Sequence, residues 1–302
     1  MNSKFKIWLQ AARLRTLPLS LSGIIVGNGL AYESDGFSLV ILVLSLATTI
    51  AFQVLSNFAN DYGDGVKGTD NESRIGPARV LQQGLLTRAQ LKKGIQICAA
   101  VSLVFAFALI YVAFGTSDLL YSLIFIILGI ASVVAAIKYT VGSNAYGYRA
   151  LGDLFVFLFF GGVSVLGSYF LQAQEFQIDL ILPATALGLL SVGVLNLNNM
   201  RDIHTDKEVN KITMAVLLGA SLSKAYHAFL LIGAVLTTVF YVKMDIQPAY
   251  LFMIAVLPMM IHLRRVLGYT DPKEFDPELK RLALCTFLFA ILFAILFAIL
   301  YL

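Results

Sequence analysis

The chain has 302 residues, of which 59% are hydrophobic and 13% are charged, and its formal net charge is +4. Soluble domains carry roughly 25% charged residues, so this composition excludes an ordinary soluble protein. A nucleic-acid partner is not expected either, because the sequence has no basic stripe with interleaved aromatic residues on a soluble domain.

The first predicted element is a short interfacial segment, residues 1–16, in which basic residues alternate with Phe5, Trp8 and Leu9. This pattern is typical of a helix that lies in the membrane surface. Nine apolar runs of roughly 16–20 residues follow, each long enough to cross a bilayer as a helix. The first run is interrupted by Pro18 and several glycines, and the eighth is short. They cover residues 17–32, 38–57, 94–113, 120–137, 153–172, 180–199, 225–242, 249–263 and 285–302.

The sequence therefore predicts a single all-α domain over residues 1–302, an integral membrane bundle of nine transmembrane helices. If the N-terminus is cytoplasmic, every Lys and Arg except Lys243 falls on the cytoplasmic side. Such a bias is the positive-inside signature. It predicts a multi-pass protein of the cell membrane whose polar segments 58–93 and 200–224 are cytoplasmic loops.

Two matching acidic clusters open these polar segments. The first reads NFANDYGDGVKGTD (57–70) and the second reads NLNNMRDIHTDKE (196–208). Asp202 lies four predicted spans after Asp61, which suggests two four-helix halves followed by a ninth helix. We expect both clusters at one mouth of the bundle.

The spacing of the polar residues predicts that each cluster forms one face of a helix. If the second span continues past Asn57, then Asn57, Asp61 and Asp64 lie at i, i+4 and i+7. In the second cluster, Asn198, Asp202 and Asp206 lie at i, i+4 and i+8.

Carboxylate and amide oxygens suit Mg²⁺, which also keeps waters and substrate phosphates as ligands. Two such faces would hold Mg²⁺ with a diphosphate between them, and a metal-bound diphosphate is a good leaving group. The alternative for any single aspartate is a solvated residue at a helix end. Basic residues that would assist diphosphate departure follow each cluster, although the positive-inside bias alone also predicts them: Lys67, Arg74, Arg79, Lys207 and Lys211.

Four stretches of this sequence resemble the UbiA superfamily of intramembrane aromatic prenyltransferases. They are NDYGDGVKGTD (60–70), RIGPARVLQQGLLT (74–87), KYTVGSNAYGYRALGDLFVFLFFG (138–161) and LNLNNMRDIHTDKEVNK (195–211), with ARLRTLP (12–18) as a weaker fifth. The wider superfamily usually has a third acidic residue where this chain has Gly68. The KGTD arrangement ending in Asp70 instead resembles the 1,4-dihydroxy-2-naphthoate polyprenyltransferase branch. Asn210 departs from that pattern, in which a Gly precedes the Lys.

The resemblance implies a UbiA-like fold and a reaction. A polyprenyl diphosphate would lose its diphosphate with the help of Mg²⁺, the 1,4-dihydroxy-2-naphthoate ring would attack the allylic cation, and carbon dioxide would leave to give demethylmenaquinone. The substrates and the lipid bilayer are thus the expected partners. The implied Mg²⁺ ligands are Asn57, Asp61, Asp64, Asp202 and Asp206, assisted by Asp70.

The resemblance also implies substrate contacts. The Tyr139 ring would stabilise a cation, and Lys138 would meet diphosphate or the ring carboxylate, or else extend to the membrane edge. Tyr148 and Arg149, with Tyr146, would shape the naphthoate pocket. The remaining implied substrate-binding residues are Asn57, Lys67, Arg74, Arg79, Asn198, Lys207 and Lys211.

Two alternatives remain open at this point. The first is a prenyltransferase of the same fold for another aromatic acceptor, such as 4-hydroxybenzoate. The second is an ion-coupled transporter, which is disfavoured because transporters place coupling sites near the midplane and these clusters lie at a mouth. Of the other polar residues, His227 and His262 are expected to be hydrogen-bonded packing residues. Asp153 is costly in a membrane and would orient Arg149, contact substrate or lie at the interface.

Overall fold

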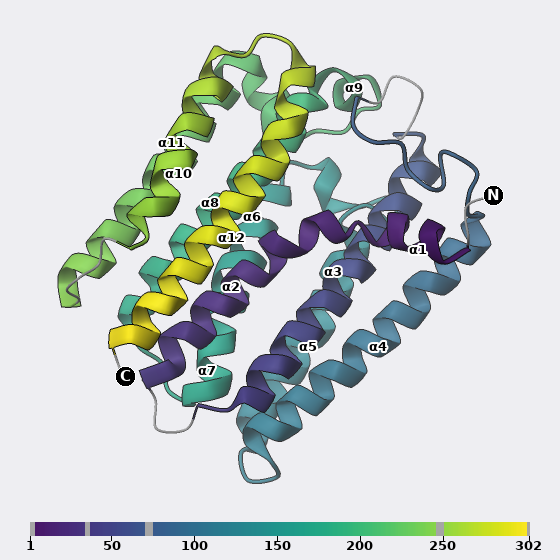
Figure 1. Cartoon of the computed structure of the whole chain (residues 1–302). Helices are drawn as coiled ribbons and strands as arrows, with labels where there is room; N and C mark the ends of the chain where they lie inside the picture. Colours follow the sequence, from purple (N-terminus) through teal and green to yellow (C-terminus); the bar gives the residue numbers. More distant parts are fainter. Residues whose placement is uncertain (1–3, 34–36, 70–74, 246–250, 301–302) are drawn as a thin grey trace.

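The computed structural model describes residues 4–33, 37–69, 75–245 and 251–300. Within these ranges the named elements are all helices, and extended pairing is limited to an isolated bridge between Arg149 and Ile212. The all-α prediction is therefore confirmed for the described chain. Figure 1 shows the long helices running side by side as one bundle.

The helical elements are most easily followed in chain order. They are α1 (Lys4–Ala12), η1 (Leu14–Thr16), α2 (Leu17–Leu30), η2 (Ala31–Glu33), α3 (Leu39–Lys67), α4 (Arg88–Phe114), α5 (Leu119–Lys138), η3 (Tyr146–Tyr148), α6 (Gly152–Val156), η4 (Phe157–Leu166), α7 (Gly167–Ala173), η5 (Ile178–Leu180), α8 (Ile181–Arg201), α9 (Ile203–Glu208), α10 (Met214–Asp245), α11 (Met253–Gly268), η6 (Pro272–Glu274) and α12 (Phe275–Leu300).

Among the described residues, seven helical segments are long and apolar enough to cross a membrane. Two further helices match predicted spans but are shorter: α2 has 14 residues and α11 has 16. Helix α2 packs between α12 and α3, and α11 packs against α10 and α12. The chain is therefore a multi-pass membrane bundle, and the count of nine spans stays a prediction.

Helix α3 extends well beyond its apolar part and carries the first acidic cluster. It begins after Ser38, whose hydroxyl accepts a hydrogen bond from the Ile41 amide, and it continues to Lys67. Gly68 ends it with φ 74°, a left-handed conformation that glycine adopts without a steric penalty. The predicted extension of the helix past Asn57 is confirmed.

The second acidic cluster does not lie on one continuous helix, so that prediction is wrong. Helix α8 ends at Arg201, Asp202 has φ −97° and ψ 10°, and α9 begins at Ile203. The turn is nevertheless kept compact, because the Asp206 amide donates a hydrogen bond to the Asp202 carbonyl over 2.8 Å. The break therefore leaves Asp206 hydrogen-bonded through its backbone to Asp202.

The two predicted cytoplasmic loops are also shorter than expected. In segment 58–93, helix α3 continues to Lys67 and α4 begins at Arg88, where Thr87 and Gln90 form a capping box. In segment 200–224, the end of α8, α9 and the start of α10 leave only Asp202 and residues 209–213 outside helices. Polar composition misled the boundary prediction, because polar helix ends that project from a membrane look like loops in sequence.

The predicted span 153–172 is helical, and its middle part is a π-helix. Its α-helical ends, α6 and α7, flank the π-helix η4. A Cβ atom on Gly161 would lie 2.8 Å from the Gly188 Cα atom of α8, so the backbones touch at this point. π-helical turns are rare and often occur beside functional sites, and η4 lines the cavity described below.

Candidate active site

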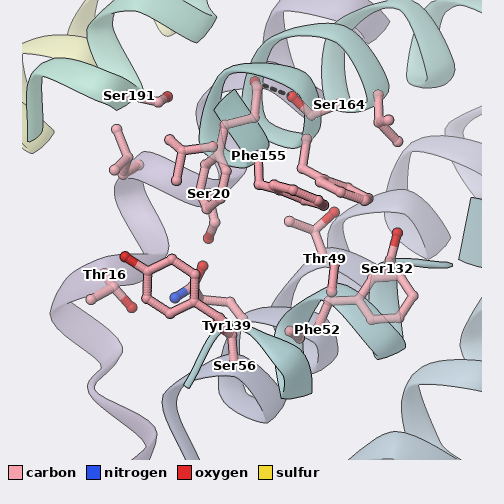
Figure 2. Close-up of a pocket in the computed structure, with 18 of the residues that line it drawn as sticks. Thr16, Ser20, Thr49, Phe52, Ser56, Ser132, Tyr139, Phe155, Ser164 and Ser191 are labelled. Atoms are coloured by element: carbon pink, nitrogen blue, oxygen red, sulfur yellow. Dashed lines mark hydrogen bonds between the residues drawn. The ribbon is translucent and has the colours of Figure 1, made fainter. Parts of the chain in front are cut away.

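A cavity of about 430 Å³ lies inside the bundle, and its lining includes residues of α2, α3, α4, α5, η4 and α8. Both acidic clusters contribute to its polar part, through Asn57, Asn60, Asp64 and Asn198. The rest of the wall is largely apolar and includes Leu109, Ile110, Phe125, Phe159, Phe160 and Val163. Figure 2 shows Tyr139, Ser20, Thr49 and Phe155 arranged around the same space.

In the first cluster, three predicted metal ligands are buried on one face of α3. Asn57, Asp61 and Asp64 are 2%, 1% and 6% exposed. Asp61 forms ion pairs with Arg13 and with Arg79, whose Nε atom lies 3.5 Å from Asp61 Oδ1. Arg13 also lines the cavity, but the sequence reasoning gave it no role in the site.

Asp64 is held by a tyrosine from the segment after α5. The Tyr148 hydroxyl donates a hydrogen bond to Asp64 Oδ1 over 2.7 Å and lies 2.6 Å from the Thr69 hydroxyl. The Lys67 ammonium lies 3.7 Å from the centre of the Tyr148 ring. Burial and the neighbouring Asp64 carboxylate raise the pKa of Tyr148, which keeps its hydroxyl protonated as a donor.

The second cluster is organised by Arg201, a buried residue that the sequence reasoning missed. Its guanidinium donates to both carboxylate oxygens of Asp202, through Nε to Oδ1 over 2.8 Å and Nη2 to Oδ2 over 2.7 Å. It also donates to Asn198 Oδ1 over 2.8 Å and to Asp276 Oδ1 over 2.6 Å. Its position in the sequence, directly before Asp202 and three residues after Asn198, could have indicated that Arg201 contacts both residues.

Asp206 and Lys211 connect the second cluster to the first. Lys211 Nζ lies 3.2 Å from Asp206 Oδ1 and 5.6 Å from the centre of the Tyr148 ring. Burial lowers the pKa of Lys211, but the Asp206, Asp64 and Asp202 carboxylates raise it by more than burial lowers it. The net shift of the Lys211 pKa is therefore upward. Lys211 therefore lies within the electrostatic influence of carboxylates from both clusters.

One oxygen of this arrangement is left without a partner. Asp206 is 2% exposed, and its Oδ2 atom has no hydrogen-bond partner among the described residues. Burial raises the pKa of Asp206 to about 6, although Lys211 opposes that shift and Asp202 adds to it. A buried carboxylate oxygen without a donor favours a nearby cation.

The oxygen donors of this site fit a hard divalent cation such as Mg²⁺. Within the described ranges, however, no group of three or more His, Cys, Asp or Glu residues is arranged to hold a metal ion. The side chains would therefore supply only part of a coordination shell, as is usual for Mg²⁺ that also binds substrate phosphates.

Some residues predicted to contact substrate lie away from the cavity. Lys138, Arg149 and Lys207 are exposed, and none of the three is among the described residues that line it. Arg149 instead donates to Asn144 Oδ1 over 2.6 Å. Lys67 is exposed over the Tyr148 ring, whereas Arg79 and Lys211 do line the cavity. Asp70 and Arg74 lie outside the described residues.

Aromatic residues from the segment after α5 do reach the cavity. Tyr139 and Tyr146 both line it, with ring centres 5.3 Å apart, and Tyr146 stacks on Phe155 at 4.0 Å. Asp153, which was expected to orient Arg149, contact substrate or lie at the interface, accepts a hydrogen bond from the Tyr226 hydroxyl over 3.0 Å. Arg149 donates its hydrogen bond to Asn144 instead.

The two membrane histidines form a polar network apart from the cavity. His227 Nε2 and His262 Nε2 lie 3.0 Å apart, and His262 Nδ1 lies 2.5 Å from Glu278 Oε2. The Tyr269 hydroxyl donates to Glu278 Oε1 over 2.9 Å. The prediction of hydrogen-bonded packing histidines is confirmed, but Glu278, which is fully buried, was missed.

Two bacterial proteins with the same name are similar to this chain over most of its length. The chain is 42% identical to the 1,4-dihydroxy-2-naphthoate octaprenyltransferase of Escherichia coli over 92% of this chain and 91% of that protein. It is also 42% identical to the protein of the same name in Haemophilus influenzae, over 96% and 95% of the two chains.

Solved structures with low sequence identity share the fold. A UbiA homologue from Aeropyrum pernix superposes with a TM-score of 0.69 at 17% identity, covering 96% of this chain and 99% of that one. A homologue from Archaeoglobus fulgidus bound to DMAPP and Mg²⁺ gives a TM-score of 0.66 at 15% identity, covering 97% and 99%. The sequence model of the UbiA prenyltransferase family matches residues 20–284 of this chain. This chain belongs to the UbiA prenyltransferase family.

Proposed function

We propose that this protein transfers a polyprenyl group from polyprenyl diphosphate to 1,4-dihydroxy-2-naphthoate. Diphosphate and carbon dioxide leave, and the product is demethylmenaquinone. The observation that carries this proposal is that residues of both acidic clusters line the polar part of an otherwise largely apolar cavity. The names of the Escherichia coli and Haemophilus influenzae relatives support the naphthoate acceptor.

The acidic clusters would hold Mg²⁺ together with the diphosphate. The proposed ligands are Asp61 and Asp64, with the Asn57 amide oxygen, and Asp202 and Asp206 opposite them; Asp70 is a further candidate. The unpartnered Asp206 Oδ2 atom supports this assignment, as does the Mg²⁺ in the Archaeoglobus fulgidus homologue. When bound, the metal neutralises the charge that builds on the leaving diphosphate.

The protein's own cations and aromatic rings would supply the rest of the chemistry. Arg79 and Lys211 line the polar part of the cavity and would balance the diphosphate charge. The Tyr139 ring faces the same space (Figure 2) and would stabilise an allylic cation by roughly 0.5–2 kcal/mol. The apolar wall would accommodate the polyprenyl tail and exclude water, which would otherwise convert the cation to an alcohol.

The naphthoate would lie beside Tyr139 and Tyr146, because these rings and Phe155 form an aromatic surface on the cavity wall. Tyr148 has a different part in this proposal, since its hydroxyl holds Asp64. Lys138 and Arg149, the residues expected to meet the acceptor carboxylate, are exposed. Arg79 and Lys211, which were expected to assist diphosphate departure, line the cavity and are better placed to meet that carboxylate as well.

We also propose nine spans with the N-terminus and the polar mouth in the cytoplasm. The distribution of Lys and Arg supports this orientation, and α2 and α11 would be the two shorter spans. Labelling of single cysteines introduced at residues 4 and 118 from each side of sealed vesicles would test it. We expect residue 4 to react from the cytoplasmic side and residue 118 from the opposite side.

The test of function is an assay with the purified protein in lipid nanodiscs. With Mg²⁺, a polyprenyl diphosphate and 1,4-dihydroxy-2-naphthoate, we expect diphosphate and carbon dioxide to be released in equal amounts. Asp61→Ala and Asp202→Ala should each abolish turnover while the protein remains folded. Reaction with 4-hydroxybenzoate and not with the naphthoate would contradict the proposed acceptor.

A further inference from the structure

Arg13 reaches the first acidic cluster from an unusual backbone position. It lies between α1 and η1 with φ 48° and ψ 56°, a left-handed conformation that is uncommon for residues other than glycine. Such conformations cost free energy and persist where the surrounding contacts hold them in place. The Arg13 guanidinium donates a hydrogen bond to Asp61 Oδ1, 48 residues further along the chain.

The turn that carries Arg13 is tied to the same helix face as Asp61. The side-chain amide of Asn57 donates to the Ala12 carbonyl over 2.8 Å and to the Thr16 hydroxyl over 3.0 Å. Just before this turn, Trp8 packs against Phe58 with ring centres 5.3 Å apart. In Figure 1, α1 lies across the bundle at the end where α3 finishes and α4 begins. The segment is therefore anchored over the polar mouth of the cavity.

The contact between Arg13 and Asp61 affects the balance of charge at the polar mouth of the cavity. Asp61 is 1% exposed, and a buried carboxylate needs compensating charge. Two guanidinium groups, those of Arg13 and Arg79, lie against this one carboxylate, and both line the cavity. A site that takes up a cation at Asp61 must therefore find a second anionic partner for at least one arginine.

We infer that Arg13 exchanges partners when substrate binds. In the free protein it neutralises Asp61; when a metal-bound diphosphate occupies the mouth, Asp61 binds the cation and Arg13 binds diphosphate oxygens. Arginine suits this exchange because its planar fork binds carboxylate and phosphate with equal geometric fit. Arg13 is thus a diphosphate-binding residue and also a group that pairs with Asp61 when the site is empty. The inference rests on the proposed function, since it takes a diphosphate as the ligand.

The two roles of Arg13 predict opposite effects of its removal. Without Arg13, Asp61 is more available to a metal ion alone, so Mn²⁺ should bind Arg13→Gln more tightly than the wild type. The same variant has lost charged hydrogen bonds to the diphosphate, so it should bind pyrophosphate with Mn²⁺ more weakly. Charged hydrogen bonds of this kind correspond to a change of roughly 10- to 100-fold in affinity.

The experiment measures both affinities in nanodiscs. Free Mn²⁺ is counted by electron paramagnetic resonance, and radiolabelled inorganic pyrophosphate is counted by equilibrium binding. Arg88→Gln is the matched control, because Arg88 is an exposed arginine at the start of α4; it should change neither affinity. Arg13→Lys, which keeps the charge and loses the fork, should fall between Arg13→Gln and the wild type.

Unchanged affinities in Arg13→Gln, or a parallel loss of both, would overturn the inference. A parallel loss in Arg13→Lys as well would mark Arg13 as a purely structural residue. The outcome is separable from that of the proposed function, because no acceptor is present. Opposite shifts in a protein that fails to prenylate the naphthoate would leave the partner exchange standing and remove only the proposed acceptor.

Discussion

The guanidinium of Arg201 binds both carboxylate oxygens of Asp202, the residue at which α8 ends. Both side chains are buried, and the same guanidinium reaches Asp276 at the start of α12. A Cβ atom on Gly76 would lie 2.8 Å from the Arg201 Cζ atom, so the segment after α3 packs against it as well. Arg201 therefore fixes Asp202 relative to two other parts of the chain, the start of α12 and the segment after α3.

Replacing Arg201 by Lys should lower both stability and activity. The ammonium keeps the charge, but it cannot donate to both Asp202 oxygens and to Asp276 at once. We expect a lower thermal unfolding midpoint and a reduction of turnover by roughly 10- to 100-fold, the usual cost of losing a group that orients a metal ligand. The midpoint can be followed with a thiol-reactive dye, because Cys98 and Cys285 are free and half-buried. Wild-type turnover in Arg201→Lys would show that the fork is not needed.

The Tyr148 hydroxyl should matter for metal affinity more than for the maximal rate. Tyr148→Phe keeps the ring beside Lys67 and Lys211 but removes the hydrogen bond to Asp64. We expect the Mg²⁺ concentration for half-maximal activity to rise by roughly 10- to 100-fold, with turnover largely restored at saturating Mg²⁺. A variant with an unchanged Mg²⁺ requirement and a lower maximal rate would contradict this role.

Tyr139 and Lys138 are neighbours in sequence, yet only Tyr139 lines the cavity. Tyr139→Leu removes the aromatic face and should slow the chemical step by roughly 2- to 30-fold, as expected from a cation–π interaction. Tyr139→Phe keeps that face and should be close to wild type. Single-turnover measurements would compare them with Lys138→Ala, for which we expect a smaller loss than for Tyr139→Leu. The reverse order would return the catalytic role to Lys138.

Substitutions of two buried carboxylates, Glu278 and Asp61, should have different effects on activity. Glu278 contacts His262, Tyr269 and Arg281 in a network away from the cavity. Glu278→Gln should therefore lower the free energy of unfolding by roughly 1–3 kcal/mol, the cost of mismatched buried hydrogen bonds, without changing the KM for either substrate. Asp61→Asn should instead abolish turnover, because it removes a proposed metal ligand, and it should also lower stability, because it removes the charge that pairs with Arg13 and Arg79. An unaltered unfolding midpoint in Glu278→Gln would show that the network does not stabilise the fold.

Sequence patterns predicted most of this architecture because the bilayer imposes a strong length and composition rule on each helix. The extension of α3 past Asn57 was supposed because it places Asn57, Asp61 and Asp64 on one helix face, and the structure contains it. The break at Asp202 was not predicted, because the spacing of Asn198, Asp202 and Asp206 continues across it unchanged. The π-helical turn in η4 was also invisible, since hydrophobic runs do not distinguish helix types.

The same limit applies to the site. Asn and Asp at helical spacing marked both acidic clusters, and the structure buries Asn57, Asp61, Asp64, Asp202 and Asp206. The partners of these residues were harder to predict: Arg13 reads in sequence as an interfacial charge, and Tyr148 as part of an acceptor pocket. Basic residues are abundant at such a mouth, so which of them line the cavity emerges only from the fold, as the exposure of Lys138 and the burial of Lys211 illustrate.

The central claim is that the two acidic clusters bind one metal-bound diphosphate between them. Anomalous diffraction from crystals grown with Mn²⁺ and pyrophosphate tests this directly. We predict manganese peaks coordinated by carboxylate oxygens from both α3 and the α8–α9 turn, with the pyrophosphate bridging them. Manganese bound by only one cluster, with pyrophosphate elsewhere, would contradict the account.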